Sequence, residues 1–556
     1  MQTRIHRLAV AAALLGLPAT LIAQAPRFEV SYEAAANPGP ITGRLVVMIA
    51  RTQQAEPRLQ LGLRGPAMAA IDVDQLRPGQ AAVVDNGAVA YPTKLSELPP
   101  GEYFAQAVIN VYERVRRSDG HTIWVPMNDG TVEFFTTRGG NLYSDVQRIR
   151  IGGGANASIK LVVSKVIPKG TKPADTEWLK HLTIQSKKLT QFWGRPIYIH
   201  ASVLLPKGYD EHPNSYYPSI YSLGHNRTPF SFTTNPPAAG RGGGGINPAT
   251  GLDHPYETYK AWTSDGFPRV IAISLMQQTP YFPDSYSVNS ANNGPYGDAI
   301  VEEVIPYLEE KFRIIRKPYA RQLEGASTSG WQSLAMQLQH PDVFGGAWVL
   351  QPDPIDFTRY GMVNIYSDTN AFTVQAGQFV TTERYFQRTT DGQGLYSMRQ
   401  LSLFEAVLGS RGRAGYQLEA WEAIYGPVGS DGYPVPLWDK LTGKIDTAVA
   451  RYMRDNGYDL RAYAEKNWSV LGPKLAGKLH FFAGDMDDFW LNLAVYKFED
   501  FLKSTTNPKS DADFTYGRPM KGHSWHAWTW AEFVRRYAAA VKAAAPAGED
   551  TRQWNY

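Results

Sequence analysis

The sequence of 556 residues contains no cysteine. This absence excludes a thiol nucleophile, disulfide bonds, a cysteine-ligated metal and a lipid-anchored N-terminal cysteine. No run of eighteen or more uncharged apolar residues follows the first thirty positions, so no membrane span is expected. The formal net charge of +4 is small for a chain of this length and gives no support to nucleic-acid binding. Whatever chemistry the protein performs must use side chains other than thiols.

Charged residues make up only 19% of the chain and apolar residues 43%, which excludes a globally disordered protein. The length is about three times that of a typical domain, so two or more packed cores are expected.

The first 25 residues have the pattern of a secretory signal peptide. Basic Arg4 and Arg7 precede an apolar run over 8–17, and the small residues of Ala23-Gln24-Ala25 follow at a distance suited to cleavage. The alternative is a short buried helix. We expect residues 1–25 to be removed on export and the mature protein to be secreted or periplasmic.

Residues 26–154 are expected to form an all-β domain of the Ig-like β-sandwich type. Short β-rich stretches over 44–51, 103–115, 131–137 and 146–151 are separated by turn residues, and no helical pattern interrupts them. The stretch over 103–115 alternates as expected for a strand with one buried face. The glycine run at 152–154 is the expected domain boundary.

From residue 155 to 556, strands alternate with helical periodicity, which predicts an α/β domain with a parallel sheet. Buried strands are predicted over 197–205, 218–223, 321–324, 346–350 and 478–483, and a helix kinked by Pro306 over 299–312. Residues 353–475 form an insertion between two of these strands that is too long for an ordinary connection. It is predicted either to build a pocket wall or to be a structural decoration.

The most informative segment surrounds Ser327. A strand is predicted to end at Glu324 and a helix to begin near Gly330, which places Ser327 at a tight strand-to-helix turn. In a nucleophile elbow such a turn exposes the serine hydroxyl, and small flanking residues are needed where strand and helix pack closely. Gly325 fits the G-x-S-x-G pattern, whereas Ser329 replaces its second glycine.

A serine hydroxyl needs a base to take its proton and an acid to orient that base. Asp485, Asp487 and Asp488 follow a buried strand directly, at the edge of the sheet where α/β ligand sites form. The histidines that lie far enough downstream are His523 and His526. The residues alone leave open which aspartate and which histidine take part, or whether this is a solvated loop.

With these residues, the region from about 186 to 530 resembles the esterase family that includes esterase D, the enterochelin esterases and the antigen 85 mycolyltransferases. The resemblance implies an α/β-hydrolase fold with Ser327 as nucleophile. The family's Gly-x-x-Asp matches the segment from Gly484 to Asp487, and its His-Ser-Trp matches the segment that begins at His523. The resemblance therefore implies the triad Ser327, Asp487 and His523.

An oxyanion hole would need the N–H of Thr328 and a second N–H from the loop that contains His225 and Asn226. Here the chain has Gly224-His225 where many relatives have His-Gly. No cofactor is expected.

The expected function is hydrolysis of a small-molecule or carbohydrate-linked carboxylic ester through an acyl-enzyme. A serine peptidase with the same triad and a catalytically degenerate binding protein are the alternatives. A metal hydrolase using His480, Asp485 and His523 lacks a compact ligand spacing such as H-E-x-x-H, so no metal is expected.

Overall fold

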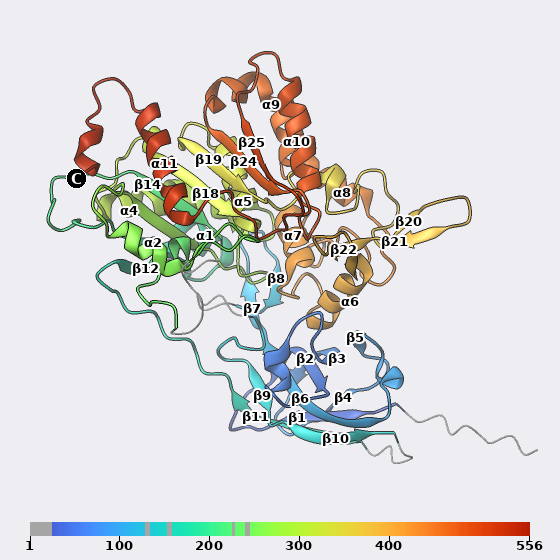
Figure 1. Ribbon diagram of the computed structural model, residues 1–556. Helices are drawn as coiled ribbons and strands as arrows, with labels where there is room; N and C mark the ends of the chain where they lie inside the picture. The colour runs from blue at the N-terminus through green and yellow to red at the C-terminus, as the bar shows by residue number, and fades with distance from the viewer. Residues whose placement is uncertain (1–24, 128–133, 153–157, 225–227, 239–244) are drawn as a thin grey trace, which may run out of the picture.

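The computed structural model describes residues 25–127, 134–152, 158–224, 228–238 and 245–556. An N-terminal β-sheet lies at one end of the molecule and a larger α/β part at the other (Figure 1). Within the described residues, no helix is long and apolar enough to cross a membrane.

The N-terminal part is a nine-stranded sheet around its own apolar core. Its strands run in the order β4-β1-β11-β9-β6-β2-β3-β5, with β10 paired to β6. Alternate residues of the first strand are buried, which gives the period of two expected when one face covers a core. The strands are β1 (Phe28–Tyr32), β2 (Ile41–Ala50), β3 (Ala67–Leu76), β4 (Ala82–Val84), β5 (Val89–Tyr91), β6 (Gly101–Val111), β9 (Leu142–Ser144), β10 (Gln147–Ile151) and β11 (Ile159–Val166).

Two predictions for this part need correction. The expected boundary at residues 152–154 comes too early, because β11 pairs in parallel with β1, with Phe28 opposite Ile159. The N-terminal sheet therefore extends to Val166, and its connection to the next part follows that residue. The predicted strand over 131–137 is also wrong where it can be followed: residues 135–137 form a turn, and 131–133 lie outside the described residues.

The second part is built on an eight-stranded sheet, in the order β12-β13-β15-β14-β18-β19-β24-β25. The first two pairings are antiparallel and the others are parallel. Every residue of β14, β15 and β19 is buried, as expected for parallel strands covered on both faces. The α/β class predicted for this part is confirmed. The strands are β12 (Leu179–Ser186), β13 (Ile197–Leu204), β14 (Ser219–Leu223), β15 (Ile271–Met276), β18 (Arg321–Ala326), β19 (Gly346–Leu350), β24 (Leu479–Gly484) and β25 (Asp513–Gly517).

Helices cover this sheet (Figure 1). The helix predicted over 299–312 occurs as α3 (Tyr296–Ala299), a π-helical segment Ile300–Val304 and α4 (Ile305–Lys311). Pro306 has no N–H to donate, and it lies in the first turn of α4, directly after the π-helical segment. The remaining covering helices are α1 (Lys187–Trp193), α2 (Pro255–Trp262), α5 (Thr328–Gln339), α9 (Leu460–Leu475), α10 (Asn492–Ser504) and α11 (Trp530–Ala544).

The segment between β19 and β24 contains four α-helices and two short β-hairpins, β20 with β21 and β22 with β23, and much of it lies beside the carboxyl edge of the sheet (Figure 1). Its last helix, α9, packs against α5 and α10. This helix belongs to the layer that covers the sheet, so the added part ends before Leu460 and not at residue 475. The other elements are β20 (Thr373–Gln375), β21 (Thr381–Glu383), β22 (Tyr385–Arg388), β23 (Gly394–Ser397), α6 (Met398–Leu408), α7 (Gln417–Tyr425) and α8 (Thr447–Asp455), and a small pair β16 (Asn289–Ser290) and β17 (Gly294–Pro295) lies outside the segment.

The N-terminal sheet contacts this added segment directly. The buried guanidinium of Arg44 in β2 donates to the carbonyl oxygens of Ala406 (2.7 Å) and Val407 (3.2 Å) at the end of α6. The hairpin of β7 (Glu113–Arg116) and β8 (Thr122–Val125) lies between the two parts (Figure 1). There the Trp124 carbonyl accepts from Arg413 at 2.9 Å.

Candidate active site

Ser327 lies at the turn between β18 and α5, as the sequence predicts, and is the N-cap of that helix. Its backbone has φ 60° and ψ −123°. A non-glycine residue in this region is strained, and such strain is typical of a serine held out at a nucleophile elbow. Neighbouring backbone groups stabilise this strained conformation, because the Ser327 N–H donates to the carbonyls of Leu350 (3.0 Å) and Gln351 (3.1 Å).

Close packing explains the residues that flank Ser327. A Cβ on Gly325 would lie 2.2 Å from Cβ of Ser329, and one on Gly330 would lie 2.6 Å from the Leu350 carbonyl oxygen. Ser329 is tolerated in place of the second motif glycine because Gly224 faces it. A Cβ on Gly224 would come within 2.2 Å of Ser329 Oγ, so one missing side chain makes room for the other.

His523 and Asp487 form a hydrogen-bonded pair. His523 Nδ1 lies 2.7 Å from Oδ2 of Asp487, whose side chain is fully buried. The carboxylate is fixed from its other side, since its Oδ1 accepts the N–H groups of Phe489 (2.9 Å) and Leu491 (3.2 Å). When Nδ1–H donates to Asp487, Nε2 of the ring keeps a lone pair that can accept a proton.

The environment of His523 raises its pKa above the ordinary histidine value. Burial alone would lower the pKa, but the charge and hydrogen bond of Asp487 outweigh it, with further contributions from Asp353 and Asp488. Gln351 links the turn that carries Ser327 to the loop that carries His523. Its backbone carbonyl accepts the Ser327 N–H, and its side-chain Nε2 donates to the His523 carbonyl at 2.7 Å.

The neighbouring candidates have other surroundings. Asp485 Oδ1 accepts the Lys521 N–H (2.9 Å) in the loop that carries His523. Asp488 Oδ2 lies 3.4 Å from the His523 backbone nitrogen. His526 is buried against Trp530, with ring centroids 5.0 Å apart, and its Nδ1 bonds the Ser524 carbonyl at 3.0 Å.

His480, named in the metal-hydrolase alternative, stacks on Trp348 with a centroid distance of 4.1 Å and bonds Asp513. In the described part of the chain, no three His, Asp or Glu side chains are grouped so that they could hold a metal ion.

Asp353 is a site residue that the sequence interpretation missed. Ser327 Oγ donates to Asp353 Oδ1 at 3.3 Å, and among the described residues it forms no hydrogen bond to the His523 ring. Asp353 follows β19 by three residues, so it lies at the same carboxyl edge of the sheet as Ser327 and Asp487. A carboxylate just after a buried parallel strand was the signal that could have identified it.

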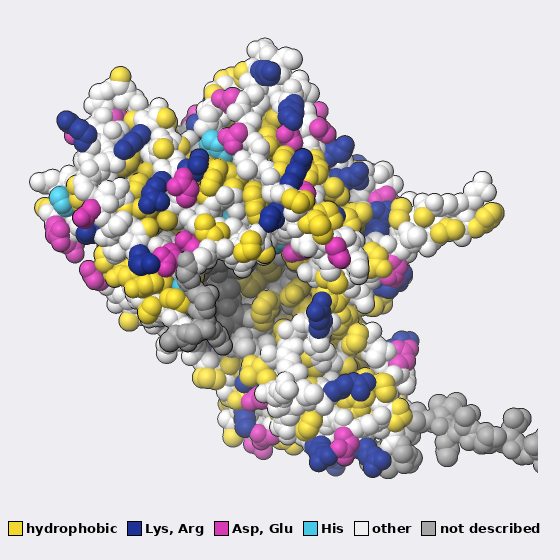
Figure 2. All heavy atoms as spheres, viewed as in Figure 1, with side chains coloured by type: hydrophobic (Ala, Val, Ile, Leu, Met, Phe, Trp, Pro, Cys, Tyr) yellow, Lys and Arg dark blue, Asp and Glu magenta, His cyan; other side chains and the backbone are white. Residues whose placement is uncertain are grey.

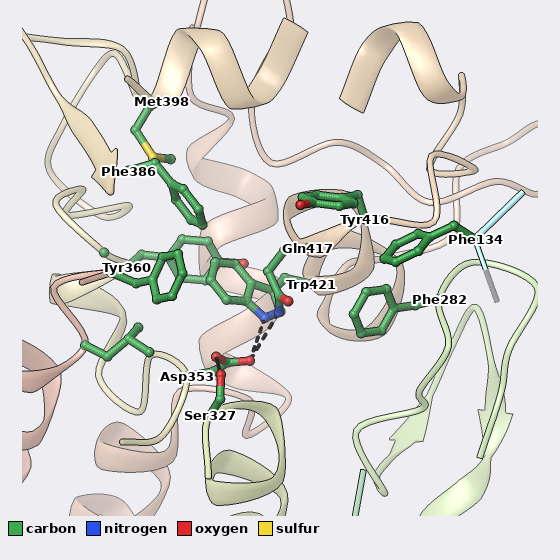
Figure 3. Close-up of a pocket in the computed structure, with 13 residues that line it drawn as sticks. Phe134, Phe282, Ser327, Asp353, Tyr360, Phe386, Met398, Tyr416, Gln417 and Trp421 are labelled. Carbon is green, nitrogen blue, oxygen red and sulfur yellow. Dashed lines mark hydrogen bonds between the residues drawn. The ribbon is translucent and has the colours of Figure 1, made fainter. Parts of the chain in front are cut away.

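Ser327 and Asp353 lie at the floor of a mostly aromatic pocket of about 250 Å³ (Figure 3). Figure 2 shows a hollow with apolar side chains between the N-terminal part and the α/β part. Most of the pocket wall comes from the added segment, which agrees with the pocket-wall alternative, and the N-terminal part contributes Phe134. The lining residues are Phe134, Phe282, Ser327, Asp353, Tyr360, Gly361, Phe386, Met398, Tyr416, Gln417, Trp421, Phe489 and Leu491.

Of the predicted oxyanion-hole residues, Thr328 is the first residue of α5, where backbone N–H groups have no partner within the helix. His225 and Asn226 lie outside the described residues.

Residues 197–355 match the model of the family Esterase, described as "Putative esterase". This match confirms the predicted resemblance for that part of the chain. No curated protein matches the sequence.

Several solved structures are similar at low identity. An S-formylglutathione hydrolase from Agrobacterium tumefaciens is 12% identical, with 66% of this chain and 95% of that chain covered and a TM-score of 0.30. A ferulic acid esterase from Anaeromyces mucronatus is 15% identical, with 67% and 93% covered and a TM-score of 0.28. A fluorophosphonate-binding serine hydrolase from Staphylococcus aureus is 14% identical, with 65% and 98% covered and a TM-score of 0.30. At these scores the likenesses carry no argument about substrate.

Proposed function

We propose that the protein is a serine hydrolase that cleaves carboxylic esters through Ser327, His523 and Asp487. The observation that carries the proposal is the pairing of His523 with the buried Asp487 beside a serine in strained elbow geometry. The family match over residues 197–355 supports ester hydrolysis as the reaction class.

In this mechanism the Ser327 hydroxyl first turns from Asp353 toward His523. Nε2 takes the hydroxyl proton while Oγ bonds to the ester carbonyl carbon, and Asp487 stabilises the imidazolium that forms. The same proton then passes to the departing alkoxide, which leaves as the alcohol. Water repeats the sequence on the acyl-enzyme and releases the carboxylic acid and the free serine.

The developing oxyanion needs N–H donors aimed at its position. The N–H of Thr328 at the start of α5 is one proposed donor, aided by the helix dipole. The loop with His225 and Asn226 is the proposed source of the second.

We also propose a fold family, a type for the N-terminal sheet, a location and a substrate class. The order of the eight-stranded sheet, with the serine after β18, an acid after β24 and a histidine after β25, supports an α/β-hydrolase. The Ig-like character of the N-terminal sheet and export to the periplasm or the exterior remain proposals. The substrate class we propose is a small-molecule or carbohydrate-linked ester.

Covalent labelling tests the nucleophile. A fluorophosphonate probe should modify Ser327, and Ser327→Ala should remove the label and lower kcat for a short-chain aryl ester by several orders of magnitude. Ser333→Ala is the matched control, because Ser333 lies in the same helix with its hydroxyl bonded to the Ser329 carbonyl. A label mapped to another residue, or one tenth of the activity left in Ser327→Ala, would contradict the proposal.

A peptidase with the same triad is separated by its substrates. Parallel assays with an aryl ester and the matching aminoacyl anilide should give turnover of the ester at far higher kcat/KM. Preference for the anilide would replace ester hydrolysis by amide hydrolysis as the function.

A further inference from the structure

The buried carboxylate of Asp353 stands beside the nucleophile in a well-defined orientation. Asp353 is 3% exposed. Its Oδ2 accepts hydrogen bonds from the Tyr286 hydroxyl (2.5 Å), the Thr328 hydroxyl (3.1 Å) and the Gln417 amide (3.2 Å), with Trp421 Nε1 at 3.4 Å. Oδ1, in contrast, receives the Ser327 hydroxyl at the longer distance of 3.3 Å. One oxygen is therefore fixed by the protein, and the other is the one that a substrate group can reach.

This carboxylate has no cationic partner in the pocket. No Lys or Arg lies among the described residues that line the pocket, and Asp353 is the one charged side chain among them. Burial raises the pKa of Asp353, and the Tyr286 hydrogen bond and the charge of His523 oppose the rise. The charge of His523 offsets only part of the cost of burying this carboxylate, because the His523 ring is paired with Asp487; a ligand that brings its own positive charge offsets more of that cost.

The walls of the pocket also suit a cation. Figure 3 shows the rings of Tyr360, Tyr416, Trp421 and Phe282 around the space next to Asp353. Aromatic rings attract an ammonium group through their negative faces, most strongly where water is excluded. Carboxylate and rings together favour a positively charged group over a neutral one of the same size.

We propose that Asp353 determines specificity by binding a protonated amine on the acyl group of the ester, one or two carbons from the carbonyl that Ser327 attacks. The spacing follows from the geometry. An ammonium nitrogen about 2.8 Å from Oδ1 and a carbonyl carbon about 3 Å from Ser327 Oγ lie side by side, because Oδ1 and Oγ are 3.3 Å apart. An α- or β-amino group spans such a gap.

The same contact would free the nucleophile. An ammonium group donating to Oδ1 takes the place of the Ser327 hydroxyl, which then turns to His523 Nε2. The proposal rests on the proposed function, since it assigns a substrate class to the same serine site.

The test compares pairs of esters that differ only in charge. Phenyl 3-aminopropanoate carries an ammonium group where phenyl butanoate carries a methyl group of similar size, and phenyl 2-aminopropanoate pairs in the same way with phenyl 2-methylpropanoate. The wild-type enzyme should show at least tenfold higher kcat/KM for the amino ester of one pair. Asp353→Asn, which keeps the shape but removes the charge, should reduce that ratio at least tenfold.

Asp488→Asn is the matched control, because Asp488 also acts electrostatically on His523 but does not line the pocket. It should leave the amino-to-methyl ratio unchanged. If the ratio falls equally in both variants, the effect is a general loss of negative potential and the assignment to Asp353 fails.

Two further results would overturn the proposal. One is a wild-type ratio of one or less in both pairs, which needs no variant to fold. The other is a preference found only when the amine is on the alcohol side, tested with 2-aminoethyl butanoate against propyl butanoate. Failure of the proposed function looks different, since then neither ester of any pair is hydrolysed in a manner that depends on Ser327.

Discussion

His526 should make the protein lose stability in mild acid. Its ring is buried between aromatic side chains, and burial lowers its pKa from 6.5 to about 4. A histidine with a lowered pKa in the folded state takes up a proton more readily when unfolded. The contribution of neutral His526 to the free energy of unfolding is therefore intact above the unfolded pKa of about 6.5, and it is lost as the pH falls toward 4. The full shift corresponds to about 3 kcal/mol, and about 2 kcal/mol of it should be lost between pH 7 and pH 5.

The assay is thermal or urea unfolding of the wild type and of His526→Asn between pH 7 and pH 5. Asparagine can still donate to the Ser524 carbonyl but does not titrate, so the variant should be less stable at pH 7 and should lose less stability on acidification. The difference between the two profiles isolates His526 from carboxylates that titrate in both proteins. Parallel profiles would refute the burial argument.

The remaining predictions concern the triad, the elbow and metal ions. Asp487→Asn should lower kcat on the order of 10⁴-fold and move the acid limb of kcat/KM to lower pH, because the charge that raises the His523 pKa is gone. Asp485→Asn should have a mild effect on kcat, since an amide oxygen can still accept the Lys521 N–H. A pH–rate profile of both variants decides which aspartate matters more. His523→Ala should abolish activity while His526→Asn retains it, and the reverse result would exchange their roles. Ser329→Gly, which restores the motif glycine, should lower the unfolding free energy by about 0.5 kcal/mol, because glycine is less favourable than serine in a helix such as α5; equal melting temperatures would contradict this. Dialysis against EDTA should leave ester hydrolysis unchanged, since the proposed oxyanion donors are N–H groups, and activity that returns only with added zinc or calcium would oppose the mechanism.

Much of the α/β part could be predicted from local sequence patterns. The strand at Gly346–Leu350 and the turn at Ser327 were predictable because a short apolar run and small residues near a serine have meaning without knowledge of distant partners. The placement of Asp487 and His523 came from a resemblance to a family, since spacing alone could not choose among three aspartates and two histidines.

The missed features depend on contacts between distant segments. The strand β11 fits either domain by its composition, and its assignment is decided by its pairing with β1, which is distant in the sequence but adjacent in the sheet. Asp353 gains its importance from Tyr286 and Gln417, which lie 67 and 64 positions away in the sequence. No local sequence pattern predicts such contacts between distant residues.

The contact of Arg44 with the end of α6 bears on how this protein could be re-engineered. The last carbonyls of a helix carry partial negative charge, and here a cation from the other part of the chain satisfies two of them. Transplanting the catalytic part without the N-terminal sheet would leave those carbonyls unsatisfied and remove Phe134 from the pocket wall. A chimera should therefore retain residues 28–166 or supply a substitute arginine, because the two parts are not interchangeable modules.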